Sequence, residues 1–176
     1  MKVITAPEHY DLQPGEISVF LAGGITNCED WQTEVIKLLQ KNNYPTDIEN
    51  LVIFNPRREN FPINDPNAAQ EQIEWEFNAL EKCDIFSMYF SGGDSDQPIC
   101  MYEIGRNIVR MQMKHPLDWM ERIIITVEKG YKREQDVRIQ TQLACGELFI
   151  PMSQWMSFAV ETHEDQIITA YGTLLE

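Results

Sequence analysis

Four short apolar runs, each followed by a helix-like pattern, constrain the fold of this 176-residue chain more than any other feature. Each run has the length of a strand and is rich in β-branched or aromatic residues, which is typical of buried β-strands. Strands that alternate with helices predict βαβ units with right-handed crossovers and therefore a parallel sheet. The runs are residues 17–22, 51–54, 85–90 and 122–127.

The segments between the runs carry apolar residues at helical spacing. In one of them Ile73, Phe77 and Leu80 form the expected buried stripe, which places Glu76 on an exposed face. Thr26 or Asn27 can cap the first helix. The pattern predicts helices over 28–41, 65–82, 98–113, 134–145 and 153–175.

The predicted fold class is α/β, with a doubly wound, mostly parallel five-stranded sheet and helices on both faces. The length favours a single domain over residues 1–176. Residues 1–16 are expected to form an irregular lead-in or a short edge element. A short fifth strand is expected at 148–150, and 152–176 is expected to hold a C-terminal helix.

The charge balance favours a small-molecule ligand. Asp and Glu number 28 against 14 Lys and Arg, and the net charge of −14 repels nucleic acids and anionic membranes. The four cysteines include no C-x-x-C pair and no secretory signal is recognisable, so reduced thiols in a cytoplasmic protein are expected. No apolar run reaches the roughly 18 residues of a membrane span.

Several kinds of site are poorly supported by the motifs. The chain has no G-x-G-x-x-G and no G-x-x-x-x-G-K-[ST], so neither a dinucleotide nor a P-loop site is expected. His9, His115 and His163 are far apart in the sequence, which argues against a zinc site and a serine–histidine triad. No cofactor and no metal are therefore expected.

Loops that follow the first three runs share one edge of the predicted sheet, where open α/β sheets hold ligands. Gly23-Gly24 lets the backbone approach a ligand closely, although a plain tight turn explains the pair equally well. Arg57-Arg58, after Asn55, suggests an anion clamp, and taken alone it also fits a solvated charged turn.

Glu103 follows the third run and a polar glycine loop, near the start of a predicted helix. The positive end of the helix dipole is expected to keep this carboxylate ionised, which suits a nucleophile. Asp84, Asp94 and Asp96 lie beside the same crossing, and paired carboxylates cleave glycosidic bonds in retaining mechanisms. A solvated acidic loop is the alternative.

Five motifs in this order resemble those of the nucleoside 2-deoxyribosyltransferase-like family, over about residues 17–140. The resemblance implies a flavodoxin-like fold and cleavage of the N-glycosidic bond of deoxynucleosides. In such proteins the sugar then passes to another base or, in relatives that act on nucleoside monophosphates, to water. The motifs are Phe20–Ile25, Phe54–Arg58, Gln72–Glu76, Asp84-Ile85 and Pro98–Gly105.

The resemblance also implies roles for individual residues. Glu103 matches the family nucleophile, and Asp84 matches an aspartate that protonates or hydrogen-bonds the departing base. A second family aspartate falls on Gln97 here, which leaves Asp96 or Asp94 as the acid. A family tyrosine is replaced by the glycine pair, with Tyr102 or Tyr89 as candidate substitutes. The expected substrate-binding residues are Gly23, Gly24, Asn55, Arg57, Arg58, Asp94, Gln97 and Tyr102.

The expected function is therefore transfer of a deoxyribosyl group between nucleobases through a glutamyl-glycosyl intermediate. One alternative is hydrolysis of a nucleoside 5′-monophosphate, with Arg57 or Arg58 holding the phosphate. Another is a non-catalytic nucleotide-binding or sensing module. The resemblance further implies a homo-oligomer, for which the apolar surface of the C-terminal helix is a candidate contact.

Overall fold

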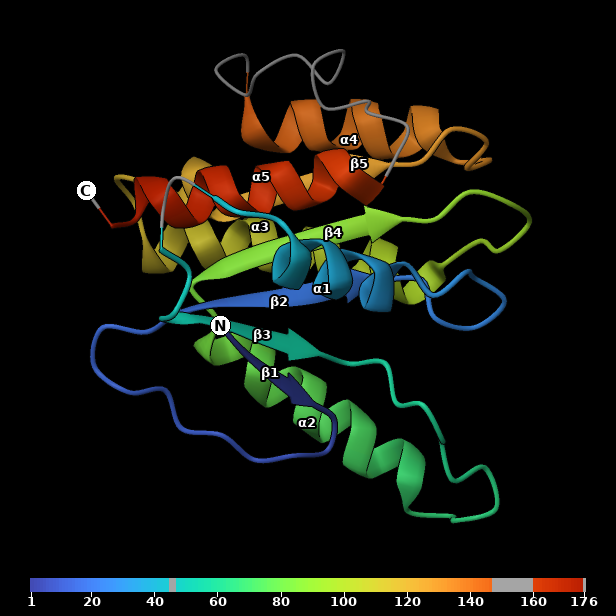
Figure 1. The fold of residues 1–176 in the computed structure, drawn as a ribbon. Helices are drawn as coiled ribbons and strands as arrows, with labels where there is room; N and C mark the ends of the chain where they lie inside the picture. The colour runs from blue at the N-terminus through green and yellow to red at the C-terminus, as the bar shows by residue number, and fades with distance from the viewer. Residues whose placement is uncertain (45–46, 147–159, 176) are drawn as a thin grey trace.

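The computed structural model describes residues 1–44, 47–146 and 160–175. Its centre is a five-stranded parallel sheet with the strand order β1-β3-β2-β4-β5 (Figure 1). The strands are β1 (Lys2–Thr5), β2 (Ile17–Gly23), β3 (Leu51–Asn55), β4 (Ile85–Phe90) and β5 (Ile123–Val127).

Helices cover both faces of the sheet. In Figure 1, α1 and α5 lie in front of the sheet, and α2 and α3 lie behind it. Val137 and Cys145 of α4 belong to the same core cluster as α2 and α3. The helices are α1 (Trp31–Lys41), α2 (Ala68–Lys82), α3 (Pro98–Lys114), α4 (Glu134–Cys145) and α5 (Val160–Thr173), with a short 3-10 helix at Trp119–Arg122.

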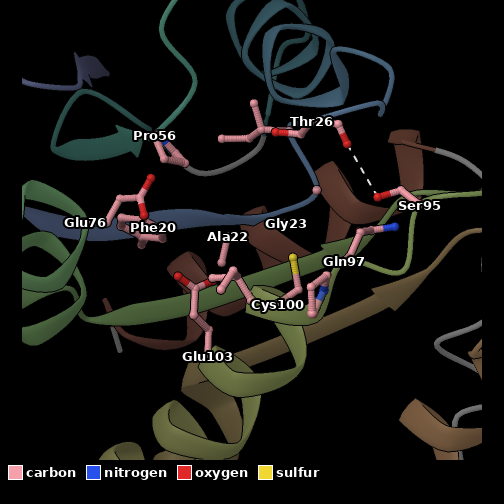
Figure 2. A pocket seen from close by; sticks show the side chains of 14 residues that line it. Phe20, Ala22, Gly23, Thr26, Pro56, Glu76, Ser95, Gln97, Cys100 and Glu103 are labelled. Atoms are coloured by element: carbon pink, nitrogen blue, oxygen red, sulfur yellow. Dashed lines mark hydrogen bonds between the residues drawn. The ribbon is translucent and has the colours of Figure 1, made fainter. Parts of the chain in front are cut away.

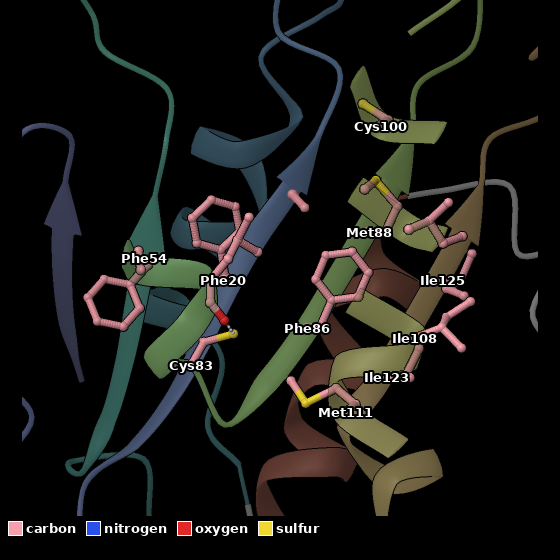
Figure 3. Close-up of a cluster of buried hydrophobic side chains, with 14 of the residues drawn as sticks. Phe20, Phe54, Cys83, Phe86, Met88, Cys100, Ile108, Met111, Ile123 and Ile125 are labelled. Carbon is pink, nitrogen blue, oxygen red and sulfur yellow. Dashed lines mark hydrogen bonds between the residues drawn. The ribbon is translucent and has the colours of Figure 1, made fainter. Parts of the chain in front are cut away.

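The strands alternate strictly between two buried cores. In β2, Val19 and Leu21 pack toward α1 and α5, whereas Phe20 and Ala22 pack toward α2 and α3. Figure 3 shows the second core, with aromatic side chains of the strands facing residues of α3. Because both faces of the central strands are covered, their sequences read as continuous apolar runs.

The predicted doubly wound, flavodoxin-like architecture is confirmed. The four apolar runs form β2 to β5, except that Arg122 lies in the 3-10 helix. The fifth strand is β1, within the expected lead-in, and pairs in parallel with β3. The strand predicted at 148–150 lies outside the described residues, as do residues 153–159 of the predicted C-terminal helix.

The start of α1 differs from the prediction. Asp30 is the N-cap, and its carboxylate accepts a hydrogen bond from the backbone N–H of Thr33 at 3.1 Å. Thr26 and Asn27 belong to the loop that precedes the helix. The loop that precedes α1 is therefore longer than predicted, and its backbone carbonyl groups accept hydrogen bonds from Arg57.

The buried side of α2 was predicted only in part. Leu80 is buried as expected, but Ile73 and Phe77 are 64% and 51% exposed, and Trp75 is buried beside Leu80. Glu76 is consequently half-buried rather than exposed. The rotation of this one helix brings a carboxylate to the end of the sheet where a ligand is expected.

The connections after β2 and β4 leave the sheet on opposite faces, toward α1 and α3 respectively. These two strands are neighbours, with Gly23 of β2 in register with Tyr89 of β4. Diverging connections at adjacent strand ends leave a crevice, which is the usual ligand site of an open α/β sheet. Within the described residues, no helix is both long and apolar enough to span a membrane.

Candidate active site

A pocket of about 330 Å³ lies in this crevice (Figure 2). Its walls come from the end of β2 and the following loop, from the β4–α3 loop, and from the facing sides of α2 and α3. The lining residues are Phe20, Ala22, Gly23, Gly24, Ile25, Thr26, Pro56, Glu76, Ser95, Gln97, Pro98, Ile99, Cys100 and Glu103.

Glu103 projects into this pocket from the sixth position of α3 (Figure 2). The pKa of Glu103 is raised to about 7, mainly by burial and also by the nearby charge of Glu76, while Arg106 opposes the shift. The expectation that the helix dipole keeps this carboxylate ionised is wrong, because the dipole acts mainly within the first turn. Near neutral pH the carboxyl group is poised between its two protonation states.

Glu76 enters the same pocket from α2, and sequence reasoning missed it. Gln72 holds its carboxylate: the Gln72 Nε2 group donates to Glu76 Oε1 at 2.8 Å and to the Pro56 carbonyl at 2.7 Å. Burial also raises the pKa of Glu76. Glu76 lies between Trp75 and Leu80, which are both buried on the side of α2 that faces the sheet. This position in the sequence could have indicated that Glu76 also faces inward.

Gln97 fixes the β4–α3 loop at the edge of the pocket. Its backbone is left-handed, with φ of 45°, and its side-chain amide donates to the Ser91 carbonyl at 2.7 Å and accepts from the Ser91 N–H at 3.3 Å. Gly24 packs against this amide so closely that a Cβ at that position would collide with it. Any side chain at this position would therefore displace the Gln97 amide that fixes the loop.

The Arg57 guanidinium is hydrogen-bonded to other parts of the protein, so it does not form the predicted anion clamp. Every polar atom that its guanidinium reaches lies in the β2–α1 loop or the first turn of α1. These atoms are the carbonyl oxygens of Ile25, Cys28 and Glu29, the side-chain oxygen of Gln32 at 2.9 Å and the carboxylate of Asp30 at 3.4 Å. Arg57 thus shapes one wall of the pocket from behind.

Arg58 is also engaged outside the pocket. It forms an ion pair with Glu71 at 3.0 Å and lies over the ring of Phe61. Asn55, expected to bind substrate, instead accepts a hydrogen bond from the Arg57 N–H at 3.0 Å, which fixes the turn after β3. None of these three residues lines the pocket.

We expect Arg57→Ala to lower the free energy of unfolding by about 2–3 kcal/mol, because four hydrogen bonds from a charged group are lost. The neighbouring Arg58→Ala removes one surface ion pair and should cost less than about 1 kcal/mol. Urea unfolding measures both variants. If both variants kept the stability of the wild type and selectively lost affinity for a 5′-monophosphate, the two arginines would bind the phosphate as the sequence predicted.

The predicted aspartates lie away from the pocket. Asp84 is at the opposite end of the sheet, where its carboxylate accepts hydrogen bonds from the N–H and hydroxyl of Ser18, both at 2.8 Å. Asp94 is exposed, and Asp96 pairs with Lys132 at 2.9 Å. Tyr102 is 71% exposed. Of the sequence-predicted residues, the pocket brings together Gly23, Gly24, Gln97 and Glu103.

A second polar cluster lies under α5, on the other face of the sheet. His163 is fully buried between Ser87 and Thr126, with Nε2 2.6 Å from the Ser87 hydroxyl and Nδ1 2.7 Å from the Thr126 hydroxyl. Burial lowers the pKa of His163 to about 3. Sequence spacing gave no hint of this contact, and its complete burial suits a structural role.

The donor set of the pocket suits proton transfer and nucleophilic attack. Among the described residues no group of three or more His, Cys, Asp or Glu side chains is arranged to hold a metal ion. Two carboxyl groups with raised pKa values, flanked by Thr26, Ser95 and Gln97, can attack a carbon centre and protonate a leaving group.

Fold and pocket together define a flavodoxin-like α/β protein with an acidic pocket at the switch point of its sheet. The family model "Nucleoside 2-deoxyribosyltransferase like" matches residues 16–115, and the chain belongs to this family. The matched region runs from the start of β2 to the end of α3 and thus contains every residue of the pocket. A comparison with curated proteins finds no match.

Proposed function

We propose that the chain cleaves the N-glycosidic bond of a (deoxy)nucleoside through a glycosyl intermediate on Glu103 and transfers the deoxyribosyl group to another nucleobase. The observation that carries this proposal is the pair of carboxyl groups, Glu103 and Glu76, that enter one pocket from two helices. Family membership supports the same chemistry.

Burial raises the pKa of both carboxyl groups, and the charge of Glu76 helps to raise that of Glu103 to about 7, so a proton held near neutral pH resides mainly on Glu103. The reaction proceeds from the form of the pair in which this proton lies on Glu76 instead. Ionised Glu103 attacks C1′ while the bond from C1′ to the base nitrogen breaks. The departing nitrogen takes the bonding electrons and the proton of Glu76. The incoming base then attacks C1′, Glu76 accepts its proton, and the Glu103 carboxylate is released.

The lining of the pocket favours an uncharged nucleoside over a 5′-monophosphate. Among the described residues that line it there is no lysine or arginine, and both arginines expected to bind phosphate are engaged elsewhere. Two carboxyl groups would repel a phosphate dianion. The apolar side chains of Phe20, Ile25 and Ile99 suit the faces of a base and a sugar.

The test is chromatography of products formed from a panel of deoxynucleosides, ribonucleosides and their 5′-monophosphates, each with and without a different free base. A new nucleoside that forms only in the presence of the acceptor base supports transfer. Free base that accumulates without an acceptor indicates hydrolysis instead. If no substrate reacts, the proposal fails and a nucleotide-binding module becomes the better reading.

The identity of the acid gives a second prediction. Glu76→Gln should lower kcat by about 10²–10⁴-fold, because the amide cannot protonate the base. With a nucleoside whose base already carries a positive charge, the same variant should lose much less of its kcat, because the departing base needs no proton. Asp84→Asn should keep its turnover within a few-fold and lose stability, since its carboxylate only anchors Ser18. The reverse ranking of the two variants would return the acid role to Asp84.

A further inference from the structure

The Gln72 side chain joins two parts of the pocket wall. It lies half-buried on α2, one helical turn before Glu76, and its Nε2 group donates to both Glu76 Oε1 and the Pro56 carbonyl. Pro56 and Glu76 both line the pocket, and Figure 2 shows them on the same side of it. Gln72 therefore ties a carboxyl group of the helix to the loop that follows β3.

The orientation of this amide is fixed by the nature of its partners. A backbone carbonyl and an ionised carboxylate can only accept hydrogen bonds, so the NH₂ group of Gln72 must face both of them. The Gln72 Oε1 atom is consequently buried without a hydrogen-bond partner among the described residues. An unpartnered buried acceptor costs free energy of folding. Stability alone therefore does not account for a glutamine at this position.

The two carboxyl oxygens of Glu76 have different surroundings. Oε1 accepts the hydrogen bond from Gln72, whereas no donor among the described residues reaches Oε2. A carboxyl oxygen that carries a proton is a poorer acceptor, so the contact with Gln72 is best kept when the proton of Glu76 is on Oε2. Because Glu76 lines the pocket, Oε2 is the oxygen left for a ligand.

We infer that Gln72 is a positioning residue for proton transfer, which holds Oε1 of Glu76 so that the proton is delivered from Oε2 to the departing base. This inference rests on the proposed function, in which Glu76 is the acid. Oε2 gives its proton to the base nitrogen as the bond to C1′ breaks, and Oε1 keeps the hydrogen bond from Gln72. On the return step Oε2 accepts the proton of the incoming base. Neither step requires the carboxyl group to rotate.

The substitution Gln72→Met, which keeps the length of the side chain but removes the donor, tests this role by kinetics. For an uncharged nucleoside kcat should fall about 10–10²-fold with KM within a few-fold, because a misplaced acid slows only the chemical step. With a nucleoside whose base already carries a positive charge, kcat should stay close to that of the wild type. In the Glu76→Gln background the same substitution should cause no further loss. A loss that persists with the charged base, or that adds to the effect of Glu76→Gln, would overturn the inference.

The matched control is Gln70→Met. Gln70 donates to Glu74 at 2.6 Å, which is an amide–carboxyl contact of the same i,i+4 spacing on the exposed side of α2. Both variants should keep the circular dichroism of the wild type, and Gln70→Met should keep its turnover with every substrate. A similar fall of kcat in both variants would indicate a general effect on α2 and would also contradict the positioning role.

A measurement without turnover separates this inference from the proposed reaction. Carbon-13 NMR of labelled glutamate carboxyl groups follows the titration of Glu76, whose signal is assigned by its loss in Glu76→Gln. Burial raises the pKa of Glu76 and the Gln72 contact lowers it, so Gln72→Met should raise this pKa further and Gln70→Met should leave it unchanged. An unshifted titration in Gln72→Met overturns the inference even if nucleosides react. A shifted titration in a protein that reacts with no nucleoside supports the hold of Gln72 on Glu76 and overturns the proposed function instead.

Discussion

Glu103→Gln should abolish cleavage of the glycosidic bond and, above pH 7, stabilise the folded protein. The amide is nearly isosteric with the carboxyl group but is a poor nucleophile, so a loss of kcat of at least about 10³-fold is expected. The variant should still bind a nucleoside, since the shape of the pocket is unchanged.

The gain in stability follows from the raised pKa of Glu103, which is about 7 in the folded protein against 4.5 for the ordinary side chain. The folded state retains the proton more strongly, so stability is fully present below pH 4.5 and is lost as the pH rises toward 7. At pH 8 this cost is about 3 kcal/mol, since each pKa unit corresponds to 1.36 kcal/mol. Glutamine has no such cost.

Steady-state kinetics and urea unfolding at pH 8 and pH 4.5 measure the two effects. The stabilisation should be present at pH 8 and absent at pH 4.5. Glu74→Gln, at an exposed position of α2 near Glu76, is the control and should change neither quantity. Undiminished turnover of Glu103→Gln would remove Glu103 from the proposed role, and a loss of stability at pH 8 would contradict the origin of its pKa.

His163→Asn should lower the free energy of unfolding at pH 7 by about 2–4 kcal/mol. The smaller side chain cannot satisfy both the Ser87 and Thr126 hydroxyls, which are buried on neighbouring strands. These contacts fix α5 to β4 and β5, where a wholly apolar interface would allow the helix to shift. His9→Asn, at an exposed position, should have almost no effect.

The same substitution should alter the response to acid. The pKa of His163 is about 3 in the folded protein and 6.5 in an ordinary environment, so the unfolded chain binds the extra proton between these values. Stability from this group is present above pH 6.5 and is lost as the pH falls toward 3. Between pH 7 and pH 5 the loss is about 2 kcal/mol.

Glu103 opposes this trend, because its raised pKa favours the folded state on acidification. The comparison of wild type with His163→Asn cancels the contribution of Glu103. Urea unfolding at pH 7 and pH 5 should show the gap between the two proteins narrowing by about 2 kcal/mol at the lower pH. An equal gap at both values would mean that His163 titrates normally in the folded protein.

The structure also explains why a family tyrosine position is occupied here by glycines. At Gly23 a Cβ would collide with the Tyr89 carbonyl and the Trp31 ring, and at Gly24 with the side chains of Cys28 and Gln97. The backbone carbonyl therefore excludes a side chain at Gly23, whereas a side chain at Gly24 would require Cys28 and Gln97 to move. Any aromatic contact with the substrate must come from elsewhere, and Phe20 lines the pocket floor.

The sequence by itself determined the order of most strands and helices, the parallel sheet and the edge at which the pocket lies. Those properties depend on hydrophobic periodicity and on turn and strand preferences, and both can be recognised in a short stretch of sequence. It also located Glu103, Gln97 and the glycine pair at that edge, because each directly follows a strand or its loop. For residues 1–16 the sequence left an irregular lead-in and a short edge element as alternatives, and the pairing of Lys2–Thr5 with β3 decided between them.

Only the tertiary structure decided which charged side chains enter the pocket. Arg57 was directed away by carbonyl groups about 28 residues earlier in the chain, Asp84 by Ser18, 66 residues earlier, and His163 joined strands 37 and 76 residues away. Glu76 was brought inward because α2 buries Trp75 rather than Ile73. Such choices depend on the packing and desolvation of residues distant in sequence, and no local pattern encodes them.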